Sequence, residues 1–477
     1  MNRTSVSSST SSVSLTDRAS MAPRLEDLPA ELLVNIASNL TTVDYGSVRL
    51  TSSTIEQKLF DNFGREFFKR KQFMLTQSSL QTLVDISKHE ALKHYLTKVI
   101  IGTNYIPRFE SMLHSATPCA RTAIQLASHD TKKWLQELRL DQRYLIDQGL
   151  DRVLLTEALN SLPACHEIEL RDSYFPSRYR GEEKWTSYGS TEILKRFHTE
   201  AWLWWHDDEN PARRHHAYST VIHAMASSAK SKQYTAFMVT TRQHHNDLGP
   251  DAFYQPKFAN FATAFQHTTT LMLPVHMRET YDQDLSYFVS FLRHFPNLEY
   301  LRLNGTRNCD TTEWMIATKH GLNSCSLLRL SLGKMRLQSE DLNDLLSSLQ
   351  TLEHLEFFLL ELESSWAATL ARSQLPQLKI LEANMIGVGP RFGHERVGFK
   401  SSVDAIANGS SDLTTSIKVQ GPGWFDEFTG RLVVQTPSFL GIAEDESAES
   451  DSDDDLDDDD DDDDEIDEDD MDMDDEE

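Results

Sequence analysis

The chain of 477 residues contains only four cysteines, and no two of them form a Cys-x-x-Cys pair. They are Cys119, Cys165, Cys309 and Cys325. This spacing predicts neither a disulfide framework nor a zinc finger, so we expect reduced thiols in a cytoplasmic or nuclear protein. The sequence also lacks a hydrophobic run long enough to cross a bilayer and a recognisable signal peptide, so we expect no membrane partner.

Excess positive charge is absent as well. Of the 74 acidic residues, 26 lie in residues 444–477, which contain no lysine or arginine. The other 48 acidic residues (74 − 26) balance the 46 basic ones to a net charge of −2. Such a body has no strong field to attract nucleic acid, and we expect no specific nucleic-acid partner. The acidic tail repels itself and is expected to stay unfolded, either as a solubilising appendage or to bind basic proteins such as histones.

No catalytic motif is present. The sequence has no Gly-x-Ser-x-Gly elbow, no phosphate-binding loop and no His-Glu-x-x-His pattern. The densest polar cluster lies between Trp202 and His216 and includes His206 and the adjacent pair His215-His216. Its spacing fits no tetrahedral metal template, so we predict no metal, no cofactor and no enzymatic activity. We expect its tryptophans to anchor an insertion over about residues 172–216.

The N-terminal region contains a short amphipathic helix with a defined start. Pro29 fits the first helical position, and Glu31 is favourable in the first turn of a helix. The apolar residues that follow at helical spacing are Leu32, Leu33, Ile36 and Leu40.

Two more helices are predicted after it. Gly46 weakens the first of these by roughly 1 kcal/mol relative to alanine, so we expect an irregular helix there. Ser53 and Glu56 form a capping-box pattern at the start of the next helix, which should end near Lys71. The residues expected to form its buried stripe are Ile55, Leu59, Phe63 and Phe67.

This three-helix pattern over about residues 25–70 resembles an F-box, although Tyr45-Gly46 replaces the leucine-rich pair usual in that family. The resemblance implies binding of a Skp-family adaptor and, through it, a cullin. The alternative is a helical hairpin that only caps another domain. The adaptor-binding residues that the resemblance implies are Leu28, Pro29, Leu32, Leu33, Ile36, Leu40 and Val48.

A Leu-x-x-Leu-x-Leu template recurs in the second half of the chain. Its copies start at residues 298, 327, 352 and 378, which are 29, 25 and 26 residues apart. Each predicts a short parallel strand with two inward apolar residues, followed by an amphipathic helix. A last strand is expected near Ile417 and Val419, with a hairpin over 421–434. Looser upstream copies have inward pairs at Val99/Ile101, Ile168/Leu170, Phe237/Val239 and Leu271/Leu273.

These repeats resemble the irregular leucine-rich repeats that follow the F-box in one large class of such proteins. The whole arrangement resembles F-box proteins common in filamentous fungi. The resemblance implies an α/β fold with an F-box and an irregular solenoid; an ordinary α/β domain with leucine-rich parallel strands is the alternative. The expected domains are a disordered leader (1–24), the F-box (25–72), the solenoid (73–440) and a disordered acidic tail (441–477).

Side chains alternate along a strand, so residues between the inward pairs should face outward on one surface. Mixed aromatic, basic and acidic groups suit recognition of a protein segment, although an exposed strand face must be polar in any case. The candidate substrate-binding residues are Met272, Tyr300, Arg302, Arg329, His354, Glu356 and Glu382.

We therefore expect a substrate-recognition subunit of an SCF-type ubiquitin ligase, located in the cytoplasm or nucleus. It would bind the adaptor through the F-box and an unknown protein substrate through the repeats. The alternative is an acidic-tailed scaffold or chaperone for basic proteins, without a role in ubiquitination.

Overall fold

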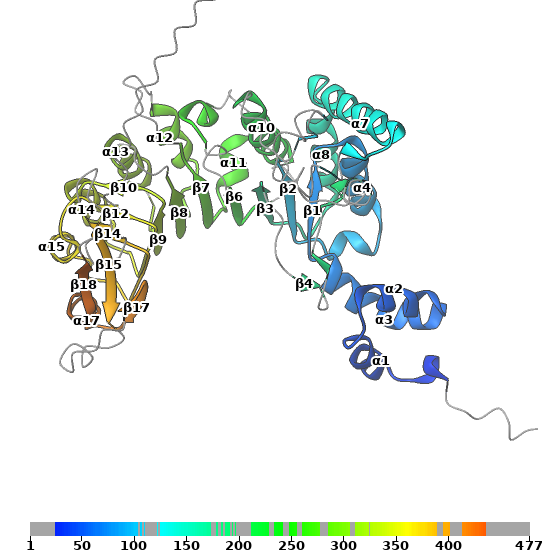
Figure 1. Ribbon diagram of the computed structural model, residues 1–477, viewed down its shortest axis with the longest axis horizontal. Helices are drawn as coiled ribbons and strands as arrows, with labels where there is room; N and C mark the ends of the chain where they lie inside the picture. Colours follow the sequence, from blue (N-terminus) through cyan, green and yellow to red (C-terminus); the bar gives the residue numbers. More distant parts are fainter. Residues whose placement is uncertain are drawn as a thin grey trace, which may run out of the picture. The chain divides into compact units, whose positions relative to one another are not determined.

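The structure is a computed structural model with a mixed α/β fold and a large, mostly parallel sheet (Figure 1). The chain divides into two units, Met1–Pro437 and Ser438–Glu477, and only the first contains described residues. The expected acidic tail, nearly all of the leader and most of the expected insertion lie outside the described residues. These are residues 24–103, 105–106, 109, 122, 125–172, 178–179, 183–184, 187–190, 193, 196, 211–228, 233–241, 248–254, 260–276, 285–305, 311–323, 325–388, 395–400 and 413–435.

The N-terminal region folds into three α-helices behind a short 3-10 turn. Helices α1 and α2 both pack against α3, which supplies the long buried stripe that its sequence predicted. The apolar side chains buried between these helices are Leu33, Ala37, Tyr45, Ile55, Leu59 and Phe67. The elements are η2 (Leu25–Asp27), α1 (Ala30–Ala37), α2 (Thr42–Leu50) and α3 (Ser53–Phe67).

Three local expectations for these helices are wrong. Helix α2 continues through Gly46, because the neighbouring Tyr45 is buried and holds the helix in place. The N-cap of α3 is Ser52, which accepts a hydrogen bond from the Thr54 N–H, and not Ser53. The side chain of Glu56 is engaged by an arginine of α2, so no capping box forms.

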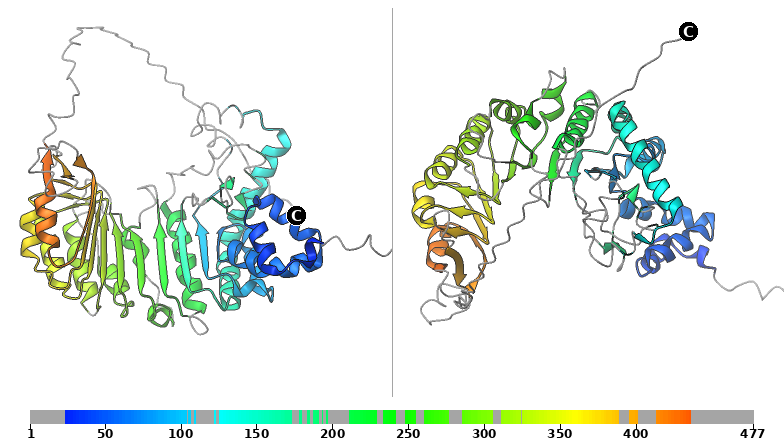
Figure 2. Two further views of the ribbon diagram at one scale, coloured as in Figure 1. Left: turned by 90° about the horizontal axis from the view of Figure 1, so that it is seen from below. Right: turned by 45° about the horizontal axis from the view of Figure 1, so that its top comes forward.

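Ten strands form the main sheet, in the order β1-β2-β3-β6-β7-β8-β9-β11-β13-β17. The first nine are parallel and lie side by side in chain order, and only β17 is antiparallel (Figure 2). The strands are β1 (Arg70–Met74), β2 (Lys98–Gly102), β3 (Glu167–Arg171), β6 (Ala236–Thr240), β7 (Thr270–Pro274), β8 (Tyr300–Asn304), β9 (Arg329–Gly333), β11 (His354–Phe358), β13 (Ile380–Asn384) and β17 (Ser416–Gln420). The expected boundary at residue 72 falls inside β1.

The predicted inward pairs are confirmed for the main-sheet strands from β2 to β17. Their side chains are buried against helices that cover one face of the sheet (Figures 1 and 2). These helices are α4 (Gln77–Lys88), η3 (Leu92–His94), α7 (His129–Asp147), α8 (Leu150–Ser161), α10 (Pro211–Ser228), η6 (Pro250–Phe253), α11 (Phe261–Phe265), α12 (Ser286–Leu292), α13 (Thr312–Leu322), α14 (Ser339–Ser348), α15 (Trp366–Arg372) and α17 (Trp424–Arg431).

One hydrogen-bond pattern recurs at the start of the parallel strands. The carbonyl oxygen of the residue immediately before a strand accepts two consecutive N–H groups at the start of the neighbouring strand, at 2.8 to 3.4 Å. The shared acceptor satisfies both donors where the chain enters the sheet, and so sets the register of each strand on the last. The acceptors are Lys69, Thr97, His166, Thr235, Thr269, Glu299, Leu328 and Glu353.

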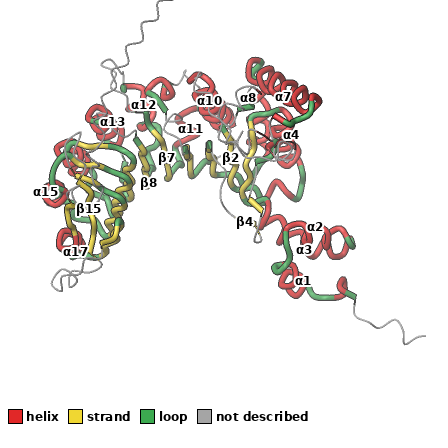
Figure 3. Tube along the Cα trace, viewed as in Figure 1, coloured by secondary structure: helices red, strands yellow, loops and turns green. Residues whose placement is uncertain are grey.

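A second sheet follows the later strands. The chain leaves β9, β11 and β13 through Lys334, Leu359 and Met385, each with a left-handed φ of 51° to 55°. Each turn leads to a two-residue strand, and the recurring conformation shows that these segments share one backbone path (Figure 3). The strands are β10 (Arg336–Leu337), β12 (Glu361–Leu362), β14 (Gly387–Val388), β15 (Glu395–Lys400), β16 (Leu413–Thr414) and β18 (Leu432–Gln435).

The expected C-terminal hairpin over 421–434 is wrong. Residues Trp424 to Arg431 form α17, with Trp424 and Phe428 buried. Strand β18 then pairs antiparallel with β15. A helix forms in place of a hairpin because Trp424 and Phe428, at positions i and i+4, fall on one buried face.

The outer edge of β1 is covered by a segment from much later in the chain. The Tyr188 N–H donates to the Gln72 carbonyl at 2.9 Å, and the Met74 N–H donates to the Tyr188 carbonyl at 3.3 Å. The ring of Tyr188 stacks on Phe73 with centroids 5.2 Å apart. Nearby, β4 (Arg178–Tyr179) and β5 (Glu183–Lys184) form a two-stranded sheet.

Helices α8 and α10 share a buried charge. The carboxylate Oδ2 of Asp151 lies 2.6 Å from His216 Nε2 and accepts a hydrogen bond from Thr220 Oγ1 at 2.9 Å. Burial alone raises the pKa of Asp151, but the bond and charge of His216, together with Thr220, outweigh it and leave that pKa below its usual value. The charged carboxylate is therefore favoured in the folded state.

We expect His216→Ala to lower the free energy of unfolding by about 3 kcal/mol at neutral pH, because it leaves a buried charge uncompensated. The depressed pKa of Asp151 contributes stability above its unfolded pKa, and this contribution is lost as pH falls through its folded pKa. Urea unfolding across that acidic range tests both statements. His129→Ala, at an exposed histidine of α7, is the control and should leave stability unchanged.

Candidate partner-binding surfaces

The N-terminal helices leave large apolar side chains in contact with solvent. The exposed fractions are 43% for Leu25, 50% for Leu32, 45% for Ile36, 63% for Val43 and 89% for Leu50. Although large apolar side chains are also exposed elsewhere, such as Leu140 and Val153, those that lie on neighbouring short helices are candidates for an interaction surface. We call this set the N-terminal apolar surface.

The residues proposed for adaptor binding do not all lie on that surface. Pro29, Leu32 and Ile36 are exposed. In contrast, Leu33 is only 2% exposed and belongs to the core between the helices, so it is unavailable to a partner. The partly buried residues, which pack against the protein's own core, are Leu28, Leu40 and Val48.

Sequence reasoning missed Leu25, Val43 and Leu50. Each lies outside the apolar stripe that its helix buries, and an apolar residue on the polar side of a short helix was the available signal. Adding them extends the surface from α1 onto η2 and the two ends of α2.

A lysine of α3 holds the start of this surface in place. Lys58 Nζ donates to the carbonyl oxygens of Glu26 at 2.7 Å and Leu28 at 2.8 Å. Ser52 Oγ also donates to the Glu26 carboxylate at 3.0 Å. These bonds fix the 3-10 turn and the residue before Pro29 against α3.

An arginine joins α2 to α3. Arg49 donates from Nε to Glu56 at 2.8 Å, and its second nitrogen bonds the other carboxylate oxygen. Its guanidinium carbon lies 3.2 Å from the centroid of the Phe63 ring. The planar group thus combines a two-point carboxylate contact with stacking, which lysine would not reproduce.

Tyr45 fills the place where the sequence departs from the F-box pattern. Its ring stacks on Phe67 with centroids 5.7 Å apart, and its hydroxyl lies 3.0 Å from Asn62 Oδ1. The tyrosine therefore supplies both apolar area and a satisfied polar group to the core.

The second candidate surface is the face of the main sheet opposite the helices. The strand register aligns the proposed substrate-binding residues in two adjacent rows. All seven are partly buried. One row is Met272, Arg302, Ser331, Glu356, Glu382 and Lys418, and the other is Thr270, Tyr300, Arg329, His354 and Ile380.

Most charges in these rows are paired. Arg329 bonds Glu356 at 3.2 Å and lies 4.5 Å above the Tyr300 ring. Glu382 pairs with Lys418 at 2.7 Å and lies 3.4 Å from His354 Nε2.

These surroundings shift the pKa values of Glu382 and His354. The hydrogen bond from Lys418 is the main cause that holds the pKa of Glu382 below its usual value. Burial, followed by the charge of Arg329, lowers the pKa of His354, which is therefore favoured in its neutral form.

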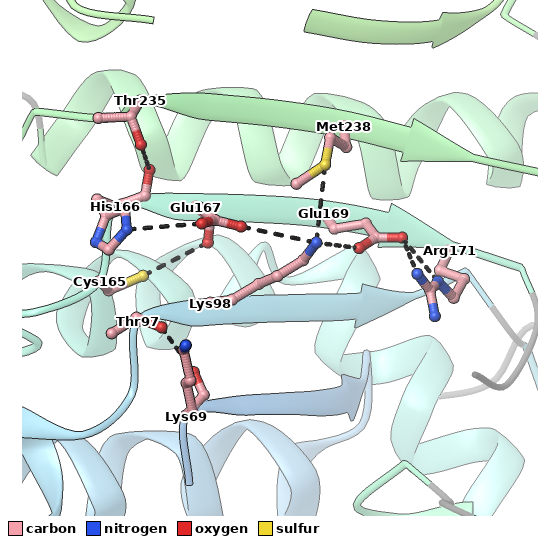
Figure 4. A network of polar contacts seen from close by, with 10 residues as sticks. All are labelled: Lys69, Thr97, Lys98, Cys165, His166, Glu167, Glu169, Arg171, Thr235 and Met238. Carbon is pink, nitrogen blue, oxygen red and sulfur yellow. Dashed lines mark hydrogen bonds and ion pairs between the residues drawn. The ribbon is translucent and has the colours of Figure 1, made fainter. Parts of the chain in front are cut away.

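A further polar network lies on β2 and β3 (Figure 4). Lys98 Nζ bonds Glu169 at 2.7 Å and also approaches Glu167 at 3.8 Å. Arg171 Nε donates to the other oxygen of Glu169 at 2.7 Å. Sequence reasoning missed this network, although charged residues alternating with the inward pairs of β2 and β3 were its signal. Glu169 is buried and is bonded to both Lys98 and Arg171, so this network stabilises the sheet.

Residues 202–209 of the tryptophan- and histidine-rich cluster lie outside the described residues, whereas His216 pairs with Asp151. Within the described part of the chain, no group of three or more His, Cys, Asp or Glu side chains is arranged to hold a metal. None of the helices described there has both the length and the apolar character needed to cross a membrane.

A scan against protein-family models and a search of curated proteins both find no match to this chain.

We expect Lys58→Ala to loosen the segment before α1, because it removes two bonds from a charged donor. Such bonds contribute about 1.5–3 kcal/mol each at most. Hydrogen exchange measured by mass spectrometry should show faster exchange in a peptide over residues 25–33 and little change in the sheet. Lys88→Ala, which removes an exposed pair with Glu157, is the control; equal exchange in both variants would contradict the role of Lys58.

Proposed function

We propose that this chain is a non-catalytic substrate-recognition subunit of an SCF-type cullin–RING ubiquitin ligase. Helices α1 to α3 would act as an F-box and bind a Skp-family adaptor. The outward face of the main sheet would bind a protein substrate. The observation that carries the proposal is the N-terminal apolar surface, because these helices bury Leu33 against the core and still expose Leu32 and Ile36.

The energetics of that surface suit a stable interface. Full burial of one leucine or isoleucine is worth roughly 1.5–3 kcal/mol, and those exposed here retain about half of their area for a partner. Association and ordering costs are deducted from this gain. The bonds from Lys58 and Arg49 lower the ordering cost, because they hold the surface in one conformation before a partner arrives.

The sheet supports the second half of the proposal. Parallel strands in chain order, each followed by a helix on the same side, favour an irregular leucine-rich-repeat solenoid over a compact α/β domain. The left-handed turns at Lys334, Leu359 and Met385 recur at intervals of 25 and 26 residues (359 − 334 and 385 − 359), as in the sequence template. The shared carbonyl acceptors from Thr269 to Glu353 recur at similar intervals, whereas those at Thr97, His166 and Thr235 are farther apart in the chain. Such a fold presents one continuous strand face to a substrate.

In this function the chain contributes positioning and no chemistry of its own. Holding a target protein near the ubiquitin-loading machinery converts a bimolecular encounter into an effectively unimolecular one.

We expect Leu32→Asp combined with Ile36→Asp to weaken adaptor binding by about 100-fold. Two side chains contributing about 1.5 kcal/mol each account for about 3 kcal/mol, and 1.4 kcal/mol corresponds to a tenfold change. Co-purification with a Skp-family adaptor and titration calorimetry measure the effect. The far-ultraviolet circular dichroism should not change, because both side chains are exposed.

Leu140→Asp combined with Val153→Asp is the matched control, since these residues are equally exposed but lie on α7 and α8. It should leave adaptor binding intact. If the Leu32 and Ile36 variant binds as well as the wild type, the ligase function is wrong. Leu33→Ala should behave differently from both, lowering the free energy of unfolding by about 2–5 kcal/mol through loss of core packing.

A further inference from the structure

Arg302 differs from four other cations on the outward sheet face. Arg329, Lys418, Lys98 and Arg171 each pair with a carboxylate. Among the residues that the structure describes, Arg302 pairs with none. Its polar contact is a long one, from Nε to Asn304 Oδ1 at 3.5 Å, and its guanidinium lies 6.0 Å from the Phe358 ring centroid.

The strand beside Arg302 adds two more donors for which the described residues supply no acceptor. Ser331 is directly opposite Arg302 in the register of β8 and β9, and its fully buried hydroxyl has no hydrogen-bond partner among those residues. Within the same described part of the chain, the buried Nε–H of Arg329 has no partner either, although the terminal nitrogen of that side chain bonds Glu356. A buried polar group without a partner costs about 1–3 kcal/mol. Ser331 is fully buried, so the partly exposed Arg302 is the donor that a ligand on the sheet face can reach.

The space around these donors is limited by apolar and aromatic groups. Met272 lies opposite Arg302 on the other side, and Tyr300 lies on the same strand. Gly333 has no side chain between Asn304 and Phe358, and an added Cβ would lie 2.8 Å from Asn304 Oδ1. An anionic group would thus meet a guanidinium that no described carboxylate neutralises, among rings and a thioether, where a charge-assisted bond is strong.

We propose that the sheet face recognises a protein segment by one acidic group, a carboxylate or a phosphate, bound at Arg302. This rests on the proposed function, since the segment would belong to the substrate. A single anion is favoured over a polyanion such as nucleic acid, because the neighbouring cations are already neutralised by Glu356 and Glu382.

The test is selection from an immobilised library of short peptides by the full-length chain. The central position is phosphoserine, Asp, Ser or Lys, and the flanking positions are degenerate. The wild type should retain peptides with phosphoserine or Asp at least about tenfold over those with Ser or Lys, as one charge-assisted bond allows. Enrichment of phosphoserine alone identifies phosphate as the ligand, and enrichment of both identifies any anion of this geometry.

Arg302→Gln should abolish the enrichment, and Arg302→Lys should keep part of it, because lysine retains the charge without the two-point geometry. Arg372→Gln, at an exposed arginine of α15, is the control and should keep all of it. Thermal unfolding of each variant verifies that it is folded. The proposal is overturned if the wild type shows no acidic preference or if Arg302→Gln retains it. If the adaptor does not bind but the acidic preference depends on Arg302, the ligase function fails and the anion site stands.

Discussion

The fold depends on a shared hydrogen bond at the entry to each parallel strand. One carbonyl oxygen accepts two consecutive N–H groups from the next strand, and the arrangement recurs from Lys69 to Glu353. These backbone bonds fix the register of each strand on its neighbour. Because side chains alternate along a strand, the leucines then face the helices and the charged residues face the open side of the sheet. Helix placement, core composition and the position of Arg302 all follow from that register.

The main sheet could be predicted because its signal is local. A strand of this kind needs two inward apolar residues at period two, and pairs such as Leu330 and Leu332 make that pattern visible without knowledge of the partners. The second sheet could not be predicted in this way. Its two-residue strands are too short for a periodic pattern, and they form because Lys334, Leu359 and Met385 take a conformation that non-glycine residues rarely adopt.

The candidate sites were predicted in part for a related reason. Sequence spacing identifies a helix with several leucines, but it does not decide which of two adjacent ones faces the helix's own core. Leu33 is buried and Leu32 is exposed, and the choice is made by α3, which lies twenty residues further along. Pairing between charges is also invisible in the sequence, so Arg302 and Arg329 looked equivalent, although among the described residues only Arg329 has a carboxylate partner.

The contact of Tyr188 with β1 has a consequence for association between chains during synthesis. A terminal strand of a sheet offers a row of unsatisfied peptide groups, and these can recruit the same strand of another molecule. Here they are occupied by backbone from a part of the chain made about a hundred residues later. During synthesis, therefore, the edge of β1 stays unpaired and open to association until the later segment emerges. A chaperone that shields this edge in the interval would raise the yield of folded protein.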